Sequence, residues 1–485
     1  MRSTFSGLNI GYKGLAAQQR ALDITGHNVA NANTEGYTRQ DVIMQASPAL
    51  KVLEGYVGTG VDVTEFRRIK DEFLDIQMRT ENKALGEWEV KSNILNKLEV
   101  IFNEPSETSL RSVMDQFWEA WQVLSKNPEG VAARTTVMQR GVALANTFNH
   151  LDAQFCDLQA DINKSIEVKV NEINSMARQI RDLNDQIIKA EASGQKANDL
   201  RDRRDLLLEK LAKNVAIDVV EDNLGAINVT IGGKFLVSRT EIAEMRFTDD
   251  PLNPIEAELE WCDSFTGDSQ GPVRLNGGIL KGYVEMRDEV IVNYQEKISA
   301  LAATIAEEVN TLHRAGYGLD GSTGLDFFTE IDDSTDFSAK NIQVNQEIIA
   351  NLNCLATASE LVFDAEDPDA DPVAYQGDGS NALRLAQLKY KLTMSDELAS
   401  FDDYYRSTIG QLGIEGQEAF QMVENRTSLV EQLLNRRESI SGVSLDEEMT
   451  NMIRFQHAYT ASARVINAMD EMLDVIVNRL GIVGR

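Results

Sequence analysis

Apolar residues recur every seven positions at both ends of the chain, which is the pattern of a long helix with one narrow apolar seam. At the N-terminus the steps are mainly of three, four and seven residues, and the seam consists of Phe5, Leu8, Tyr12, Leu15, Leu22 and Val29. The pattern stops at residues 28–39, which are rich in Asn, Thr and Gly and therefore favour a turn. We predict a helix that ends in this stretch.

The C-terminus shows a similar pattern. Residues 444–447 read Ser-Leu-Asp-Glu, a capping box that predicts a helix start, and the acidic residues at 446–448 complement the positive end of that helix. The seam that follows repeats every seven residues at Leu445, Met452, Tyr459, Ile466, Leu473 and Leu480, with Met449 at an intermediate position. We expect this helix to run to about Gly481, a plausible C-terminal stop.

Neither terminal helix gains stability from a seam that stays in water. Burying a Leu-sized side chain yields about 1.5–3 kcal/mol, so the seams must pack against each other, against another chain, or both. One interpretation is a hairpin that ties the two ends of the same chain together. The other is an assembly element whose seams pack mainly against identical or related subunits. Periodicity alone leaves both open.

The middle of the chain is predicted to be mostly helical over about 75–213. A stripe of apolar residues in steps of three and four predicts one helix from roughly 150 to 191, and a second, charge-rich helix is expected over 199–211. Turn residues separate helices at 103–108 and at 127–130. We expect the aromatic side chains of the intervening helix to fill the core: Phe117, Trp118 and Trp121.

Strand-like alternation replaces this pattern at residues 227–231, and the Gly232-Gly233 pair after them predicts a two-residue hairpin. A small β unit is therefore expected over about 216–275. Helix returns over 279–314, an irregular acidic stretch follows, and a last helical block covers about 380–440. This order suggests that domains are built from both halves of the chain, like nested hairpins.

Charge excludes several classes of function. Among 485 residues, 47 basic and 77 acidic side chains leave a formal charge of −30, which argues against binding to nucleic acid or to anionic membranes. No segment approaches the ~20 apolar residues of a membrane span. The first 30 residues lack the apolar stretch of a secretory signal, so we expect any export to use a route without a cleaved leader.

Catalytic and metal-binding motifs are also missing from the sequence. The histidines form no close pair, the cysteines form no C-x-x-C pair, and the G-x-S-x-G, phosphate-loop and dinucleotide motifs are absent. Residues 364–371 resemble the start of a calcium loop, but Pro372 stands where the loop glycine belongs and Asp378 where the bidentate glutamate belongs. We interpret that stretch as a solvated acidic loop. We expect the protein to have no enzymatic activity and to bind no metal or cofactor.

Both ends of the chain resemble a known group. Ser6-Gly-Leu8 followed by residues 30–40 (Ala-Asn-Ala-Asn-Thr-Glu-Gly-Tyr-Thr-Arg-Gln) is similar to the N-terminal signature of the axial proteins of the bacterial flagellum, namely rod, hook and first hook-associated protein. Residues 441–449 and 455–466 resemble the closing helix of that group. Internal stretches resemble the first hook-associated protein family, which joins hook to filament: residues 101–108, 117–118, 127–129, 133–134, 229–233, 277–282 and 310–313.

The resemblance implies a mainly α fold with smaller β-containing domains that are discontinuous and nested. The terminal helices would pair in a coiled-coil-like inner assembly domain (1–70 plus 440–485). A helical middle domain (71–315 plus 380–439) would contain the small β unit, and an outer variable mixed or β domain would cover 316–379, where the match is poorest. Another axial protein, hook or distal rod, is the alternative. An enzyme displayed on the flagellum and a cytoplasmic coiled-coil scaffold are weaker ones.

Partners and location follow from the same resemblance. Family members are exported unfolded by the flagellar type III apparatus, form a homo-oligomeric ring of about eleven subunits on the hook protein, and receive the third hook-associated protein. This places the chain outside the cell, at the hook–filament junction. The subunit-assembly residues would be Phe5, Leu8, Tyr12, Leu15, Leu22, Val29, Met452, Tyr459, Ile466, Leu473 and Leu480. The export chaperone would read Leu445, Met449, Met452, Tyr459 and Ile466 on the C-terminal helix.

Overall fold

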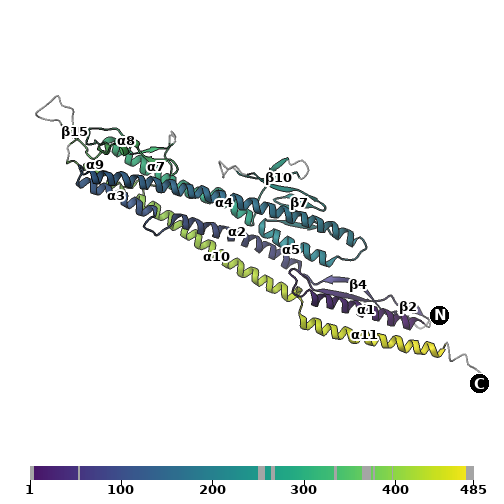
Figure 1. Ribbon diagram of the computed structural model, residues 1–485. Coiled ribbons are helices and arrows are strands. Elements are labelled where there is room, and N and C mark those ends of the chain that lie inside the picture. Colours follow the sequence, from purple (N-terminus) through teal and green to yellow (C-terminus); the bar gives the residue numbers. More distant parts are fainter. Residues whose placement is uncertain are drawn as a thin grey trace, which may run out of the picture.

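The protein is elongated, with both terminal helices at one end of a long helical stem (Figure 1). The computed structural model describes residues 5–52, 55–248, 257–263, 268–331, 336–362, 373–374, 377–395 and 397–476. Helices α1 (Ser6–Ala30) and α11 (Leu445–Asp474) lie side by side at the end where the chain begins and finishes. The predicted mainly α fold with paired terminal helices is confirmed.

Five long helices form the stem: α2 (Glu72–Phe102), α3 (Leu110–Lys126), α4 (Val131–Glu191), α5 (Asn198–Asn214) and α10 (Phe401–Ser441). The stripe that predicted a helix over 150–191 is largely buried along α4. That helix begins earlier than expected, directly after the predicted turn at 127–130, because Gly130 leaves the turn in extended backbone and serves as its N-cap. The predicted helix over 199–211 is α5.

The predicted helix over 279–314 is present in three joined segments. They are α6 (Ile279–Glu285), a π-helical turn η2 (Met286–Val290) and α7 (Ile291–Ala315). Gly277 and Gly278, which precede them, have φ angles of +149° and +90°. A Cβ on Gly278 would lie 2.7 Å from the Val215 Cα, so a side chain there would push α6 away from the end of α5.

In the described part of the small β unit, seven short antiparallel strands form two sheets. A four-stranded sheet has the order β5 (Asp218–Glu221), β6 (Ile227–Ile231), β7 (Lys234–Ser238) and β8 (Glu241–Ile242). A three-stranded sheet has the order β11 (Ser269–Pro272), β10 (Glu258–Cys262) and β9 (Glu244–Thr248). Both lie on α4 (Figure 1). Gly232 and Gly233 have φ angles of +57° and +87°, and the predicted two-residue hairpin between β6 and β7 is confirmed.

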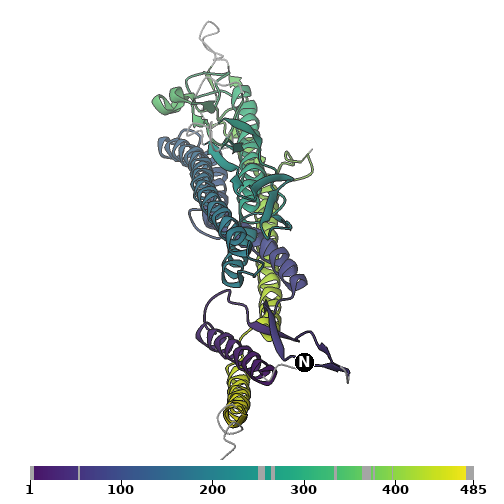
Figure 2. The same ribbon diagram turned by 90° about the vertical axis from the view of Figure 1, so that its right-hand side faces the viewer.

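A second set of strands lies beside the terminal helices and was not predicted. Strands β1 (Gln40–Ala46) and β4 (Val61–Arg68) pair antiparallel, and β2 (Leu50–Val52) pairs with β3 (Gly55–Val57) in a ribbon that extends from them (Figure 2). Only Gln40 among these strand residues is buried. The apolar alternation that marks a half-buried strand is therefore weak here.

The far end of the stem is mixed. It contains β12 (Phe328–Glu330), β13 (Ile342–Val344), α8 (Gln346–Ala350), η3 (Leu352–Cys354), β14 (Leu361–Val362), β15 (Val373–Ala374), α9 (Ser380–Gln387) and η4 (Leu388–Tyr390). The last helical block, expected over 380–440, is interrupted, because residues 391–395 and 397–400 are not helical. The acidic stretch 364–371 and Pro372 lie outside the described residues. Asp378 accepts hydrogen bonds from the backbone N–H groups of Ser359 and Ser380.

The three aromatic side chains predicted to fill the core are buried, and they also hold this end to the stem. Phe117 and Trp121 are fully buried and pack against Phe327, while Trp118 stacks on Phe401 with ring centroids 5.8 Å apart. Helix α3 is thereby joined both to the outer segment and to α10.

Buried polar side chains fix the chain after α7. The Asn310 side chain accepts hydrogen bonds from the N–H groups of Phe327 and Phe328 and donates one to the Phe328 carbonyl. The His313 Nε2 accepts from the Ala356 N–H at 3.1 Å, so its Nδ1 carries the proton and donates to the Leu325 carbonyl at 2.7 Å. Burial lowers the pKa of His313 from 6.5 to about 4, and the imidazole is held neutral.

This histidine makes stability depend on pH. Between pH 6.5 and 4 an unfolded chain binds a proton at His313 that the folded chain does not, so the free energy of unfolding falls as the pH falls through this window. We expect a loss of about 3 kcal/mol by pH 4, present in wild type and absent from His313→Asn. Urea unfolding at half-unit pH steps measures how the free energy of unfolding changes with pH in wild type and in His313→Asn. The exposed His150 provides the control, because His150→Asn should keep the wild-type slope. Equal slopes for wild type and His313→Asn would contradict this assignment.

Candidate functional site: the terminal helix pair and its joint

Helices α1 and α11 run antiparallel and approach closely through glycine. Residues with rising numbers on α1 meet residues with falling numbers on α11, which fixes the direction. A Cβ added to the α1 glycines would lie 2.7 Å from Met469 at Gly7, 2.8 Å from Ile466 at Gly11, and 3.1 Å from Ser462 at Gly14. The face of α1 that meets α11 is thus made of small residues, which lets the two backbones come together.

The N-terminal apolar seam is only partly covered in the single chain. None of its six residues is buried: Phe5 and Tyr12 are 61% and 63% exposed, and Leu8, Leu15, Leu22 and Val29 are half-buried. The buried positions of α1 are instead Gly11, Ala17, Ala21, Thr25 and Asn28. The chain therefore does form a hairpin between its two ends, yet Phe5 and Tyr12 stay exposed and the four aliphatic residues of the seam are covered only in part.

The C-terminal seam divides into two parts. Met452, Tyr459, Ile466 and Leu473 are half-buried, and Ile466 lies against Gly11. Leu445 and Met449, at the start of α11, are 51% and 58% exposed. Ser444 is the N-cap of α11, since its side chain accepts a hydrogen bond from the Glu447 N–H, while the Glu447 carboxylate pairs with Arg39. Leu480 and the expected helix end at Gly481 lie outside the described residues. Contacts of the seam residues with subunits or a chaperone stay predictions.

Asn28 organises the turn after α1. Its side-chain amide donates to the Gln40 carbonyl at 2.9 Å and to Glu448 at 3.1 Å, and its carbonyl oxygen accepts from the Tyr37 hydroxyl at 2.7 Å and the Gln40 N–H at 3.0 Å. Arg39 donates to Glu448 and to Glu447, both at 2.8 Å. Because Asn28 and Glu448 are almost fully buried, this network locks the end of α1, the turn and the start of α11 together.

The turn and β4 rest on one face of α5, which we call the α5 seat: Asn198, Asp199, Asp202 and Asp205. The Thr38 N–H donates to Asp202 at 3.0 Å, and the Gln40 side chain donates to Asp199 at 2.8 Å and accepts from Asn198 at 3.0 Å. Arg68, at the end of β4, donates to Asp202 and Asp205, both at 2.8 Å. The joint between the terminal helices and the stem is therefore polar.

The pKa values of two neighbouring carboxylates of the seat are shifted in opposite directions. Burial raises the pKa of Asp202, and the hydrogen bonds from Arg68 and Thr38 only partly offset this. Burial acts in the same direction on Asp205, but Lys70 and Arg68 outweigh it and hold its pKa below the ordinary value.

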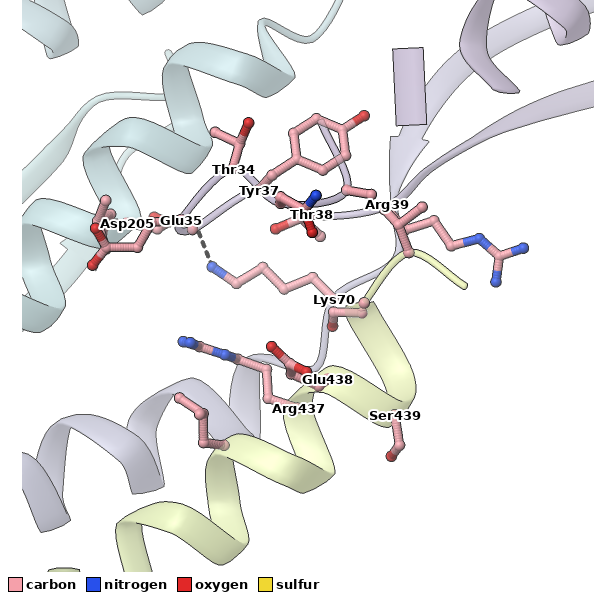
Figure 3. A pocket seen from close by; sticks show the side chains of 18 of the residues that line it. Thr34, Glu35, Tyr37, Thr38, Arg39, Lys70, Asp205, Arg437, Glu438 and Ser439 are labelled. Atoms are coloured by element: carbon pink, nitrogen blue, oxygen red, sulfur yellow. Dashed lines mark hydrogen bonds and ion pairs between the residues drawn. The ribbon is translucent and has the colours of Figure 1, made fainter. Parts of the chain in front are cut away.

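A cleft of about 810 Å³ opens beside this joint, between the turn after α1, the middle of α5 and the end of α10. Figure 3 shows Lys70 extending across it from the segment after β4 toward Asp205, with Arg437 and Glu438 of α10 on the opposite wall. Six acidic and three basic side chains line it, namely Glu35, Asp75, Asp205, Glu209, Glu438 and Glu447 with Arg39, Lys70 and Arg437. Arg437 is paired with Glu209.

The polar contacts of this region hold the terminal helices on the stem. Within the described part of the chain, no three His, Cys, Asp or Glu side chains are grouped so as to hold a metal ion. The helices described here include none that is long and apolar enough to cross a bilayer. The three cysteines are half-buried free thiols.

The sequence pattern predicted residues 28–39 only as a turn and did not reveal the hydrogen-bond network inside it. Two features of the sequence could have indicated the contact face of α1 and the charged face of α5. Gly7, Gly11 and Gly14 follow each other in steps of four and three, which is the period of a helix contact face. The other signal was the high charge of α5, which carries three of the four seat residues as aspartates.

Family models match three parts of the chain. The model of the flagellar hook-associated protein FlgK helical domain matches residues 95–328. Models of a flagella basal body rod protein and of the flagellar basal body rod FlgEFG protein C-terminal region match residues 8–38 and 437–480. The two rod models thus cover most of the terminal helices.

Similar proteins span the whole chain. Flagellar hook-associated protein 1 of Bacillus subtilis is 33% identical over 100% of both chains, and that of Escherichia coli is 28% identical over 97% of this chain and 99% of its own. The solved structure of the flagellar hook junction protein FlgK from Burkholderia pseudomallei superposes with a TM-score of 0.63 over 76% of this chain and 100% of that one, at 18% identity, which supports the fold. The chain therefore belongs to the flagellar hook-associated protein 1 (FlgK) family, a family of structural rather than enzymatic proteins.

Proposed function

We propose that this protein is a structural junction subunit that forms a ring on the distal end of the flagellar hook and connects the hook to the filament through the next hook-associated protein. The observation that carries the proposal is the partly exposed apolar seam of α1, with Phe5 and Tyr12 at the surface, in a chain similar over its full length to hook-associated protein 1. The subunit would reach this place outside the cell through the flagellar type III export apparatus.

The seam supports a role in assembly because the described residues of the chain cover it only in part. Helix α11 covers the glycine face of α1, and strands β1 and β4 lie on α1 as well, yet Phe5 and Tyr12 stay more than half exposed. Burying side chains of this size yields about 1.5–3 kcal/mol each. Neighbouring copies in a ring of about eleven, the hook protein below and the third hook-associated protein above are the surfaces that would cover them.

The same proposal predicts how far each part of the chain lies from the axis of the flagellum. Residues 1–70 with 440–485 would be the inner assembly domain, residues 71–315 with 380–439 the helical middle domain, and residues 316–379 the outer domain. The elongated shape, with the terminal helices at one end and the mixed segment at the other, supports this order (Figure 1).

A charge placed in the seam tests the assembly role. We expect the stem of Leu15→Asp to melt at the same temperature as that of wild type, because Leu15 is only half-buried in the single chain. The variant should nevertheless fail to incorporate into flagella, because an unpaired charge would be buried between subunits. Swimming in soft agar and electron microscopy give the readout. Asn9→Asp is the matched control, since Asn9 is exposed on the same helix outside the seam. Wild-type filaments from Leu15→Asp would contradict the assembly role.

The C-terminal helix is also proposed to bind the export chaperone before assembly. Leu445, Met449, Met452, Tyr459 and Ile466 would enter a groove as one amphipathic face. Because Ile466 packs on Gly11 in the folded chain, a chaperone that binds all five would take the place of α1. We expect deletion of residues 445–485 to abolish chaperone binding in a pull-down or calorimetric assay, whereas deletion of residues 5–30 should keep it. Unchanged affinity after the C-terminal deletion would rule this out.

A rod or hook protein is the second candidate, because the rod models match both ends of the chain. The match of residues 95–328 to the FlgK helical domain favours the junction protein.

A further inference from the structure

The second half of α10 leaves apolar side chains uncovered on one helix face. No residue from 420 to 440, all of which the structure describes, is buried, whereas Leu412, Gly416 and Ala419 before them are. Six residues at helical spacing border a shallow hollow of about 390 Å³ here, and we call them the α10 stripe: Phe420, Val423, Glu424, Thr427, Ser428 and Glu431. Phe420 is 60% exposed, and it gains stability only if another surface covers it.

A groove of similar size, about 390 Å³, runs between α4 and α5. We call it the α4–α5 groove, and its walls are formed by Gln179, Leu183 and Gln186 of α4 and by Arg203, Leu206 and Leu207 of α5. The three leucines are half-buried and form an apolar floor, while the glutamines and the arginine are exposed along the rims. An apolar floor between polar rims fits one face of an amphipathic helix.

The stripe and the groove carry opposite charges at the same spacing. Glu424 and Glu431 of the stripe are exposed and seven residues apart. On α5, Arg203 and Lys210 are exposed and also seven residues apart, which is about 10.5 Å along a helix. Among the residues that the structure describes, Arg203, Glu424 and Glu431 have no ion-pair partner. Lys210 pairs with Glu35 at 3.3 Å, and because both side chains are exposed this pair contributes little to folding.

One chain cannot bring its own stripe into its own groove. Helix α2 lies between α10 and α5 and packs on both (Figure 1). A contact between the stripe of one copy and the groove of another is therefore heterologous. Each copy then presents one stripe and one groove to its two neighbours, and a heterologous contact of this kind closes into a ring when its rotation allows.

We propose that the α10 stripe of one subunit lies in the α4–α5 groove of a second copy, with Phe420 over the leucine floor and the two glutamates beside Arg203 and Lys210. Asp182 at the groove is paired with Arg181 at 2.8 Å, so it does not oppose this arrangement. The inference rests on the proposed ring and names the surfaces that would join its copies. Both surfaces belong to the stem, so the contact does not depend on the order of the terminal helices before assembly.

Charge reversal with rescue tests the contact in a strain from which the gene has been deleted. The groove variant is Arg203→Glu with Lys210→Glu, the stripe variant is Glu424→Lys with Glu431→Lys, and a fourth gene carries all four changes. Like charges face each other in each double variant, and opposite charges face each other again in the combination. We expect the fraction of cells with filaments to fall at least tenfold for each double variant and to return to within twofold of wild type for the combination.

The matched control is Glu418→Lys with Asn425→Lys, two exposed positions at the same spacing on α10 but outside the stripe, which should keep wild-type filaments. Urea midpoints and the amount of subunit exported to the medium should match wild type in every variant, because all these residues are exposed. Wild-type filaments from either double variant, or a combination no better than the double variants, would overturn the contact while leaving the junction role intact. Filaments on the deletion strain without any copy of the gene would instead reject the proposed function.

Cross-linking in isolated flagella identifies the occupant of the groove. Gln186→Cys and Ser428→Cys, both exposed, are combined in a chain whose three native cysteines have been replaced by serine, and a short bismaleimide is added. We expect covalent dimers and larger multimers of this subunit from the double-cysteine chain and none from either single-cysteine chain. A cross-link from Ser428→Cys to a different flagellar protein, or no cross-link in flagella that contain the subunit, would overturn the proposal.

Discussion

Replacing Gly11 by leucine is expected to separate α1 from α11 while the stem stays folded. A Cβ at this position would already lie 2.8 Å from the Ile466 Cγ1, and the rest of a leucine side chain has no space between the two backbones. Overpacking of this kind costs about 1–3 kcal/mol, which is comparable to what a single helix contact provides. We expect the amides of α1 and α11 to exchange at least tenfold faster, and cells that carry the variant to lose filaments.

Gly26→Leu is the matched control for this substitution. Gly26 lies on the same helix, and a Cβ there would meet no atom within 4 Å. Both substitutions remove a glycine from a helix interior and so raise helix propensity by a similar amount. Equal exchange rates in the two variants would show that the glycine face is not what holds the pair together.

Replacing Arg134 by alanine is expected to destabilise the stem by about 3–5 kcal/mol. This guanidinium is almost fully buried at the start of α4, where it donates to the carbonyls of Pro128, Leu352 and Leu355 and to the Thr357 hydroxyl at 2.7–3.1 Å. Burial lowers its pKa to about 10, so it stays charged at neutral pH. Its removal leaves several buried acceptors without a donor and disconnects α4 from residues 352–357.

Urea unfolding followed by the fluorescence of the buried Trp118 and Trp121 measures this loss. The control is Arg140→Ala, because Arg140 is exposed on the same helix and its removal should change stability by less than about 0.5 kcal/mol. If Arg134→Ala and Arg140→Ala unfold at the same urea concentration, water replaces the Arg134 guanidinium without loss of stability.

Much of this architecture could be predicted from periodicity. The apolar stripe along α4 and the glycine pair between β6 and β7 each specify a local structure that packing preserves. Strands β1 and β4 escaped prediction because they bury so little of either face that their alternation is weak.

The contact face of α1 could not be found by searching for large apolar residues. Helices that approach closely select glycine and alanine at the contact, so the buried positions carry the weakest hydrophobic signal, while the leucines are only half-buried. The α5 seat could not be predicted for another reason. Its pairs join residues far apart in the sequence, such as Arg68 with Asp202 at 134 positions and Thr38 with Asp202 at 164, and only the folded chain brings them together.

Deleting the gene tests the central claim most directly, with electron microscopy of the cells and an assay for flagellin in the medium. A junction subunit predicts bare hooks on the cells and unpolymerised flagellin outside them, with filaments restored by the wild-type gene and not by Leu15→Asp. Normal filaments on the deletion strain would contradict the account, and cells without hooks would move the protein inward to the rod or the hook.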